Sequence, residues 1–232
     1  AGISPDQLAF HDVFTYLVQP PSVFGLRQEF LASSRLDNLS SVHAGLVALE
    51  NLAGTETDAA VFVAFDHEEV GSGTRSGAGG PFLQDVLHGL AAVMGFVGDG
   101  ERALLARSSC ISADAGHSVH PNYGQLHDPQ VRPLINHGPL LKINARQRYA
   151  TDAVGGAIWK RACRAAGVPT QDFVSNNSVP CGTTIGPITA SRLGITTVDV
   201  GIALLSMHSA REMCGVEDGP YLARALHAYW AE

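Results

Sequence analysis

The chain has 232 residues, of which 45% are hydrophobic and 16% are charged, so it can bury the core of one large domain or two small ones. Its formal net charge of −7 argues against a surface for nucleic acid or an anionic membrane. No apolar run approaches the roughly 18 residues of a membrane-spanning helix. The first residues show no signal peptide. The chain also lacks an initiator Met, so we expect that it was trimmed or that it begins within a longer protein.

In the first half of the chain, the sequence predicts two helices, one buried strand and one further short element. Residues 8–18 form either a strand or a short helix, which two prolines then end. Apolar residues at three- and four-residue steps from Leu39 to Leu52 predict a helix that ends at Gly54, and the apolar run 59–65 predicts a buried strand. Pro81 begins a second helix over 81–93, and 98–101 is expected to be a polar turn.

The second half of the chain predicts strands that alternate with helices. The expected strands are 109–113, 138–144, 172–175 and 195–203. The expected helices are 152–166 with Thr151 as N-cap, 186–193, and 220–230. This alternation indicates an α/β domain with a mixed, largely parallel sheet flanked by helices.

Four cysteines lie far apart and form no Cys-x-x-Cys pair: Cys110, Cys163, Cys181 and Cys214. Most of them stand among apolar or small residues. This is typical of reduced thiols in a cytoplasmic protein, although the sequence leaves a disulfide open.

Two adjacent glutamates, Glu68 and Glu69, follow the predicted strand 59–65 and precede a glycine-rich turn. Ligands of open α/β sheets bind outside the carboxyl ends of the strands, so these side chains are placed for chemistry. One glutamate can bind a metal ion while its neighbour handles a proton. The alternative is that both are solvated loop acids.

Three further candidates stand at the ends of predicted elements, namely Asp37, Asp114 and His208. Carboxylate and imidazole ligands suit zinc, cobalt or manganese, and two metal ions that share a carboxylate need about this set of side chains. Helix capping would also explain Asp37, and an Asx turn would explain Asp114. The spacing matches no His-Glu-x-x-His, nucleophile elbow or phosphate loop.

Taken together, six motifs resemble the aspartyl aminopeptidase family of co-catalytic zinc exopeptidases. They occur in the family's order: Arg35-Leu-Asp-Asn-Leu39, Asp66-His-Glu-Glu-Val-Gly-Ser72, Ser112-Ala-Asp114, His120-Pro-Asn-Tyr123, Asn144-Ala-Arg-Gln-Arg-Tyr-Ala-Thr-Asp152 and Ser206-Met-His-Ser-Ala-Arg-Glu212. The resemblance implies a metal-dependent aminopeptidase that removes N-terminal Asp or Glu from peptides. It also implies two divalent ions, zinc foremost, and a homo-oligomer.

The resemblance assigns roles by position. Asp37 would bridge both metals, Glu69 and His208 would hold one, and Asp114 the other. Glu68 would be the general base on the attacking water. The substrate pocket would include His117, Lys142 and Tyr149, with Lys142 pairing with the acidic side chain of the substrate. The alternative for Lys142 is an edge-strand lysine that opposes aggregation.

One departure from the family concerns the second metal, which should take a histidine from a His-x-Asp motif well upstream of Asp37. Here only His11 precedes Asp37, without that spacing. The family's N-terminal catalytic part and inserted β-rich domain are also absent, so residues 1–232 are expected to be the C-terminal portion of the catalytic domain, either as a fragment or as a naturally shortened protein. Alternatives are a non-catalytic subunit with an incomplete site, and a deacylase or carboxypeptidase of the same architecture.

Overall fold

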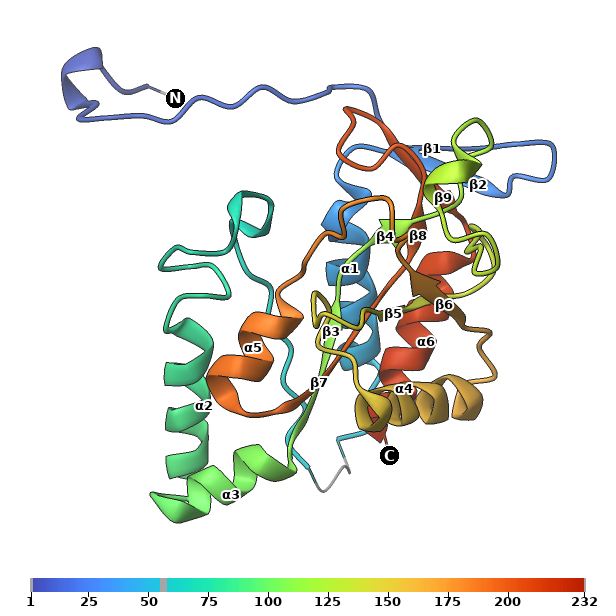
Figure 1. Ribbon diagram of the computed structural model, residues 1–232. Helices are drawn as coiled ribbons and strands as arrows, with labels where there is room; N and C mark the ends of the chain where they lie inside the picture. The colour runs from blue at the N-terminus through green and yellow to red at the C-terminus, as the bar shows by residue number, and fades with distance from the viewer. Residues whose placement is uncertain (1, 55–57, 232) are drawn as a thin grey trace.

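The computed structural model describes residues 2–54 and 58–231. Its central sheet has the strand order β3-β7-β5-β6 (Figure 1). The strands are β3 (Ser109–Ala113), β7 (Thr196–Gly201), β5 (Leu140–Ile143) and β6 (Gln171–Val174). β3 runs parallel to β7 and β5 parallel to β6, while β5 and β7 are antiparallel. The predicted mixed α/β architecture is therefore confirmed.

Two smaller sheets extend this framework toward the site. β4 (Gly116–His117) pairs in parallel with β8 (Ala203–Leu204) just beyond the ends of β3 and β7. β1 (Ser22–Phe24), β2 (Phe30–Ser33) and β9 (Glu212–Gly215) form an antiparallel sheet in that order. Because β2 leads directly into the first long helix, this sheet fixes where that helix begins.

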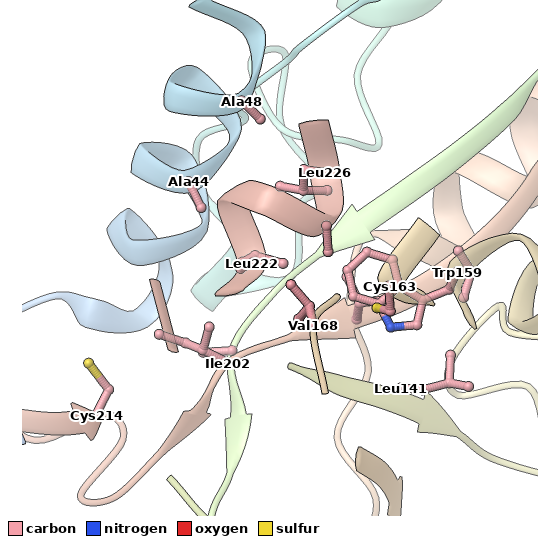
Figure 2. Packing of buried hydrophobic residues seen from close by; sticks show 14 of the residues in the cluster. Ala44, Ala48, Leu141, Trp159, Cys163, Val168, Ile202, Cys214, Leu222 and Leu226 are labelled. Atoms are coloured by element: carbon pink, nitrogen blue, oxygen red, sulfur yellow. The ribbon is translucent and has the colours of Figure 1, made fainter. Parts of the chain in front are cut away.

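The main core lies between the sheet and a group of helices, α1 (Leu36–Glu50), α4 (Ala153–Ala165) and α6 (Asp218–Ala231). Figure 2 shows Ala44 and Ala48 of α1 close to Leu222 and Leu226 of α6. The two alanines, one turn apart, let the helices approach closely, and burying each leucine contributes about 2 kcal/mol. Trp159 of α4 is fully buried in the same cluster.

The remaining helices are α2 (Phe82–Val93), α3 (Asp99–Arg107) and α5 (Gly186–Leu193), which lie together at one side of the molecule (Figure 1). Short 3₁₀ turns occur at η1 (Pro5–Gln7), η2 (Glu68–Val70) and η3 (Gly124–Leu126). None of the described helices is long and apolar enough to cross a membrane. The four cysteines are free.

Two predicted elements in the first half of the chain are wrong. Residues 59–65 form no strand, and the segment is only half buried although Phe62 contacts α1 at Gly45. An apolar run becomes a strand only where a neighbour completes its hydrogen-bond ladder, and no described residue does so here. The exposed segment 8–18, expected to be a strand or helix, is likewise neither, and it extends away from the body (Figure 1).

Two local assignments also differ from the prediction. The expected polar turn at 98–101 is the first turn of α3, where Gly98 with φ 57° precedes the helix and the acids Asp99 and Glu101 favour its N-terminus. Asp152, not Thr151, caps α4, because its carboxylate accepts the Gly155 N–H at 2.8 Å. The Thr151 hydroxyl instead accepts the N–H of Asp199 in β7.

Candidate metal centre

Three side chains from distant parts of the chain meet at one point. Asp37 comes from the first turn of α1, Glu69 from η2, and His208 from the β8–β9 loop. Their potential ligand atoms all lie within 4.8 Å of one another. The His208 Nε2 atom is 3.1 Å from Asp37 Oδ2 and 3.3 Å from Glu69 Oε2. Asp37 lies in the α1 start without capping it, so the capping interpretation does not hold.

The backbone of all three segments is unusual. Five non-glycine residues within or beside them have φ values between 58° and 65°, namely Arg35, His67, Ser72, Ser206 and His208. This left-handed region is uncommon for residues with a Cβ atom and is maintained only when surrounding contacts require it. The ligands are therefore presented by segments that the tertiary structure holds in a fixed, locally costly shape.

Close backbone contacts and hydrogen bonds hold the glycine-rich turn after Glu69 in place. A Cβ atom at Gly77 or Gly79 would lie 2.4 or 2.8 Å from the carbonyl oxygen of Ser72, so only glycine allows this close return of the chain. Arg192 of α5 donates hydrogen bonds to the carbonyl oxygens of Gly79 and Gly80. The glycine-rich turn that follows the glutamates is thus attached to a helix that packs on β7.

Burial and neighbouring acids strongly perturb Asp37. Burial, followed by the negative charges of Asp114, Glu69 and Glu212, raises the pKa of Asp37 to about 8. Burial, Asp114 and Glu69 also raise the pKa of Glu68, which precedes Glu69 in η2. Such an accumulation of acids is costly without a compensating cation. Two carboxylates and one imidazole at this separation fit a zinc ion or a similar divalent metal.

Asp114 and Lys142 form a buried ion pair beside the cluster. The Lys142 side chain is 2% exposed, and its Nζ atom donates to Asp114 Oδ2 at 3.1 Å and to the Ala115 carbonyl at 2.8 Å. β5 lies between β7 and β6, so the edge-strand interpretation of Lys142 is wrong. The Asx-turn interpretation of Asp114 is also not needed, because its carboxylate has a charged partner.

The other two residues predicted to line the substrate pocket lie near Lys142. The lysine Nζ atom is 5.4 Å from the centre of the buried Tyr149 ring. His117 is exposed in β4, yet desolvation and the charges of His127, His208 and Lys142 lower its pKa. A cavity of about 560 Å³ opens over the three candidate ligands, with Arg35, Leu39, Ser209 and Glu212 in its wall. This volume suits one or two amino-acid residues of a ligand.

Three supporting residues had no assigned role at the sequence level. Glu212 and Arg192 hold ligand-bearing segments, and Asp199 is a fully buried carboxylate in β7. Glu212 stands within a quoted motif, which was the one available signal. Arg192 and Asp199 occupy ordinary helix and strand positions, so only their contacts reveal them.

Comparisons with known proteins identify the family of the chain. The family described as "Aminopeptidase I zinc metalloprotease (M18)" matches residues 1–230. The "Probable M18 family aminopeptidase 2" of Streptomyces coelicolor is 50% identical over 232 residues, which cover 99% of this chain and 54% of that protein. The chain therefore spans about half the length of this relative.

Solved structures give the same result. The crystal structure of the M18-family aminopeptidase from Thermotoga maritima is 25% identical, with a TM-score of 0.85 over 93% of this chain and 49% of that chain. The S. cerevisiae mApe1 dodecamer is 29% identical, with a TM-score of 0.78 over 92% of this chain and 48% of its own. The resemblance seen in the sequence motifs is confirmed, and the chain belongs to the M18 family of aminopeptidase I zinc metalloproteases.

Proposed function

We propose that this chain is the C-terminal portion of the catalytic domain of a metal-dependent aminopeptidase that removes acidic residues from peptide N-termini. The observation that carries the proposal is the meeting of Asp37, Glu69 and His208 within 4.8 Å, from three separate segments. Family membership supports the peptidase chemistry, and the full-length protein would supply the remaining half of the relatives' length.

Asp37, Glu69 and His208 would hold one divalent ion, and Asp37 would share a second ion with Asp114 in the full-length protein. A bound zinc ion would supply Lewis acidity, which lowers the pKa of water and stabilises the negative charge that develops on the peptide carbonyl oxygen. The second ion requires that Asp114 turn from Lys142 toward the cation. Zinc is the family's metal, and the same donor set also accepts cobalt or manganese.

Glu68 would act as the general base. It lies beside the ligands, and its raised pKa brings the carboxylate nearer to the basicity that proton transfer at neutral pH needs. It would take a proton from the attacking water and deliver it to the leaving amine. Glu69, its neighbour, stays with the metal, so the adjacent glutamates divide the two tasks.

Preference for an acidic residue would come from Lys142, assisted by His117 and Tyr149. Lys142 is the buried cation beside the cluster, and a substrate carboxylate would replace Asp114 as its partner once Asp114 binds metal. Charge pairing in a desolvated pocket would discriminate against neutral residues. This specificity depends on the exchange of partners, since Lys142 is not unpaired in the structure.

The remaining proposals concern the whole protein. A homo-oligomer is supported by the dodecamer of the yeast relative. Four free cysteines, of which Cys163 and Cys214 are buried, support a cytoplasmic location. Peptides would be its partners.

A second candidate is a non-catalytic subunit with an incomplete metal site. It is favoured by Asp114, whose carboxylate is engaged by Lys142, and by the single three-ligand group found in the described part of the chain. A deacylase or carboxypeptidase of the same architecture would use the same residues on a different substrate.

The test uses the full-length protein that carries this chain. Metal analysis after mild dialysis is expected to find two divalent ions per chain, and fewer than one would contradict the metal proposal. Anilides of Asp, Glu, Leu and Lys, assayed beside N-acyl amino acids, separate the substrate classes. We expect the Asp and Glu anilides to be cleaved fastest. Cleavage of N-acyl amino acids alone would favour the deacylase, and inactivity on every substrate together with weak or absent metal binding would favour the subunit.

The general base is tested by Glu68→Gln, which keeps the shape of the side chain and removes its proton acceptor. Turnover is expected to fall roughly 10²–10⁴-fold with metal content unchanged. Glu69→Gln is the matched control and should lose metal. If Glu69→Gln kept its metal and lost turnover, the two roles would be reversed.

A further inference from the structure

Glu212 is a buried carboxylate placed between two of the candidate ligands. The residue is 2% exposed and is the first residue of β9. Its Oε2 atom accepts the backbone N–H of Asp37 at 2.9 Å, and its Oε1 atom accepts the backbone N–H of His208 at 2.8 Å. One carboxylate thus joins two segments that are about 170 residues apart in the sequence.

The attachment point of this carboxylate is rigid. Glu212 pairs with Ser33 at the end of β2, immediately before the segment that carries Asp37. On the other side, Leu205 and Met213 exchange backbone hydrogen bonds of 2.8 and 3.0 Å, which close the loop that carries His208. Both segments are therefore fixed relative to β9, and Glu212 sets the distance between them.

The chemistry of the contact requires a carboxylate of this length. Each oxygen accepts one N–H, so a glutamine would turn an NH₂ group toward one of the two donors. Aspartate keeps the charge and both oxygens but is shorter by one methylene, so it cannot reach both segments from the same backbone position. Both oxygens of Glu212 point at backbone donors, and Glu212 is not among the three residues that form the ligand group.

We propose that Glu212 is a positioning residue, which holds Asp37 and His208 at the separation that a divalent cation needs. It acts through the backbone of two ligands and does not contact the metal. This inference rests on the metal site proposed above. Supporting groups of this kind typically change metal affinity 10–100-fold when they are removed.

The experiment is a zinc titration of the 232-residue chain against a competing chelator. The proteins compared are wild type, Glu212→Gln, Glu212→Asp and the control Glu217→Gln, which makes the same charge change at an exposed site of the same segment. We expect both Glu212 variants to bind zinc 10–100-fold more weakly than wild type, and the control to match wild type. If Glu212→Asp kept wild-type affinity while Glu212→Gln lost it, charge alone would matter and the proposal would be overturned. Unchanged affinity in both variants would also overturn it.

A second measurement separates positioning from folding and from metal binding. In metal-free wild type, hydrogen exchange of the Asp37 and His208 amides should be slow, because both donate to Glu212. In Glu212→Gln, at least one should exchange more than about 10-fold faster, while the amide of Val200 in β7 is unchanged. Exchange in wild type at the rate of exposed loops would overturn the proposal, even if the variants fail to fold. If wild type binds no zinc but protects both amides, the proposed function fails while the cross-link stands.

Discussion

Replacing Lys142 by methionine removes one partner of a buried ion pair and preserves most of the side-chain volume. Lys142 is 2% exposed and Asp114 is 13% exposed in their side chains, so water cannot replace the lost contact. The change leaves the Asp114 carboxylate and the Ala115 carbonyl without their donor. Breaking a buried pair in this way costs about 3–5 kcal/mol of unfolding free energy. At about 2–4 °C per kcal/mol, the unfolding midpoint should fall by roughly 6–20 °C.

Urea denaturation of the metal-free chain, followed by circular dichroism, measures this loss. The control is Lys160→Met, because Lys160 pairs with Asp172 at 3.3 Å with both side chains nearly half exposed. That exposed pair should contribute less than about 1 kcal/mol. Combining Lys142→Met with Asp114→Asn should recover much of the loss, because the uncompensated charge is then absent.

The same denaturation is then repeated in the presence of zinc. If Asp114 binds a cation, zinc should stabilise Lys142→Met by more than it stabilises wild type, because the metal then replaces the missing ammonium group. If Lys142→Met lowered the unfolding free energy of the metal-free chain by less than about 1 kcal/mol, the reasoning would be refuted, because the buried pair would then contribute no more than an exposed one.

Two other buried acids give predictions that denaturation also checks. Asp199 accepts 2.6 Å hydrogen bonds from the Ser112 and Thr184 hydroxyls and the Ala150 N–H, so Asp199→Ala should lower the unfolding free energy by at least about 3 kcal/mol. Asp172→Ala, at an exposed strand position, is the control, and equal losses would contradict the prediction. Burial raises the pKa of Asp218 from 3.8 to about 6, so the folded state retains a proton that the unfolded state releases between these values. Protonated Asp218 therefore stabilises the folded state fully below pH 4, and this contribution is lost as the pH rises through 6. Over this range the unfolding free energy of wild type should fall by about 3 kcal/mol relative to that of Asp218→Asn. A pH-independent difference between the two proteins would contradict it.

Much of the fold could be predicted from the sequence. The helix α1, the strands β3, β5, β6 and β7, and the helix α5 follow from apolar periodicity and from glycine at helix ends, which are local signals. The sequence also included Asp37, Glu69 and His208 among its candidate ligands, with their roles implied by the family resemblance, and the fold brings one potential ligand atom of each within 4.8 Å of the others.

Local signals failed where a distant neighbour decides the outcome. Residues 59–65 have the composition of a strand, yet no described segment completes a ladder with them. Thr151 could cap a helix, but its hydroxyl is engaged by the N–H of Asp199 on β7, so Asp152 caps α4 instead. Hydrogen bonds of this kind join residues far apart in the sequence, so no window of sequence contains both partners.

The sequence by itself determined the set of chemical groups at the site, whereas the tertiary structure decided their partners. The family resemblance of the sequence predicted that Lys142 pairs with an acidic side chain of the substrate. The fold gives it Asp114 and a backbone carbonyl instead. The sequence likewise contains Glu212 without indicating a role. Only the pairing of β9 with β2 brings its two oxygens to the N–H groups of Asp37 and His208. Every glutamate side chain ends in the same carboxylate, and its function depends on which hydrogen-bond donors the folded chain places beside it.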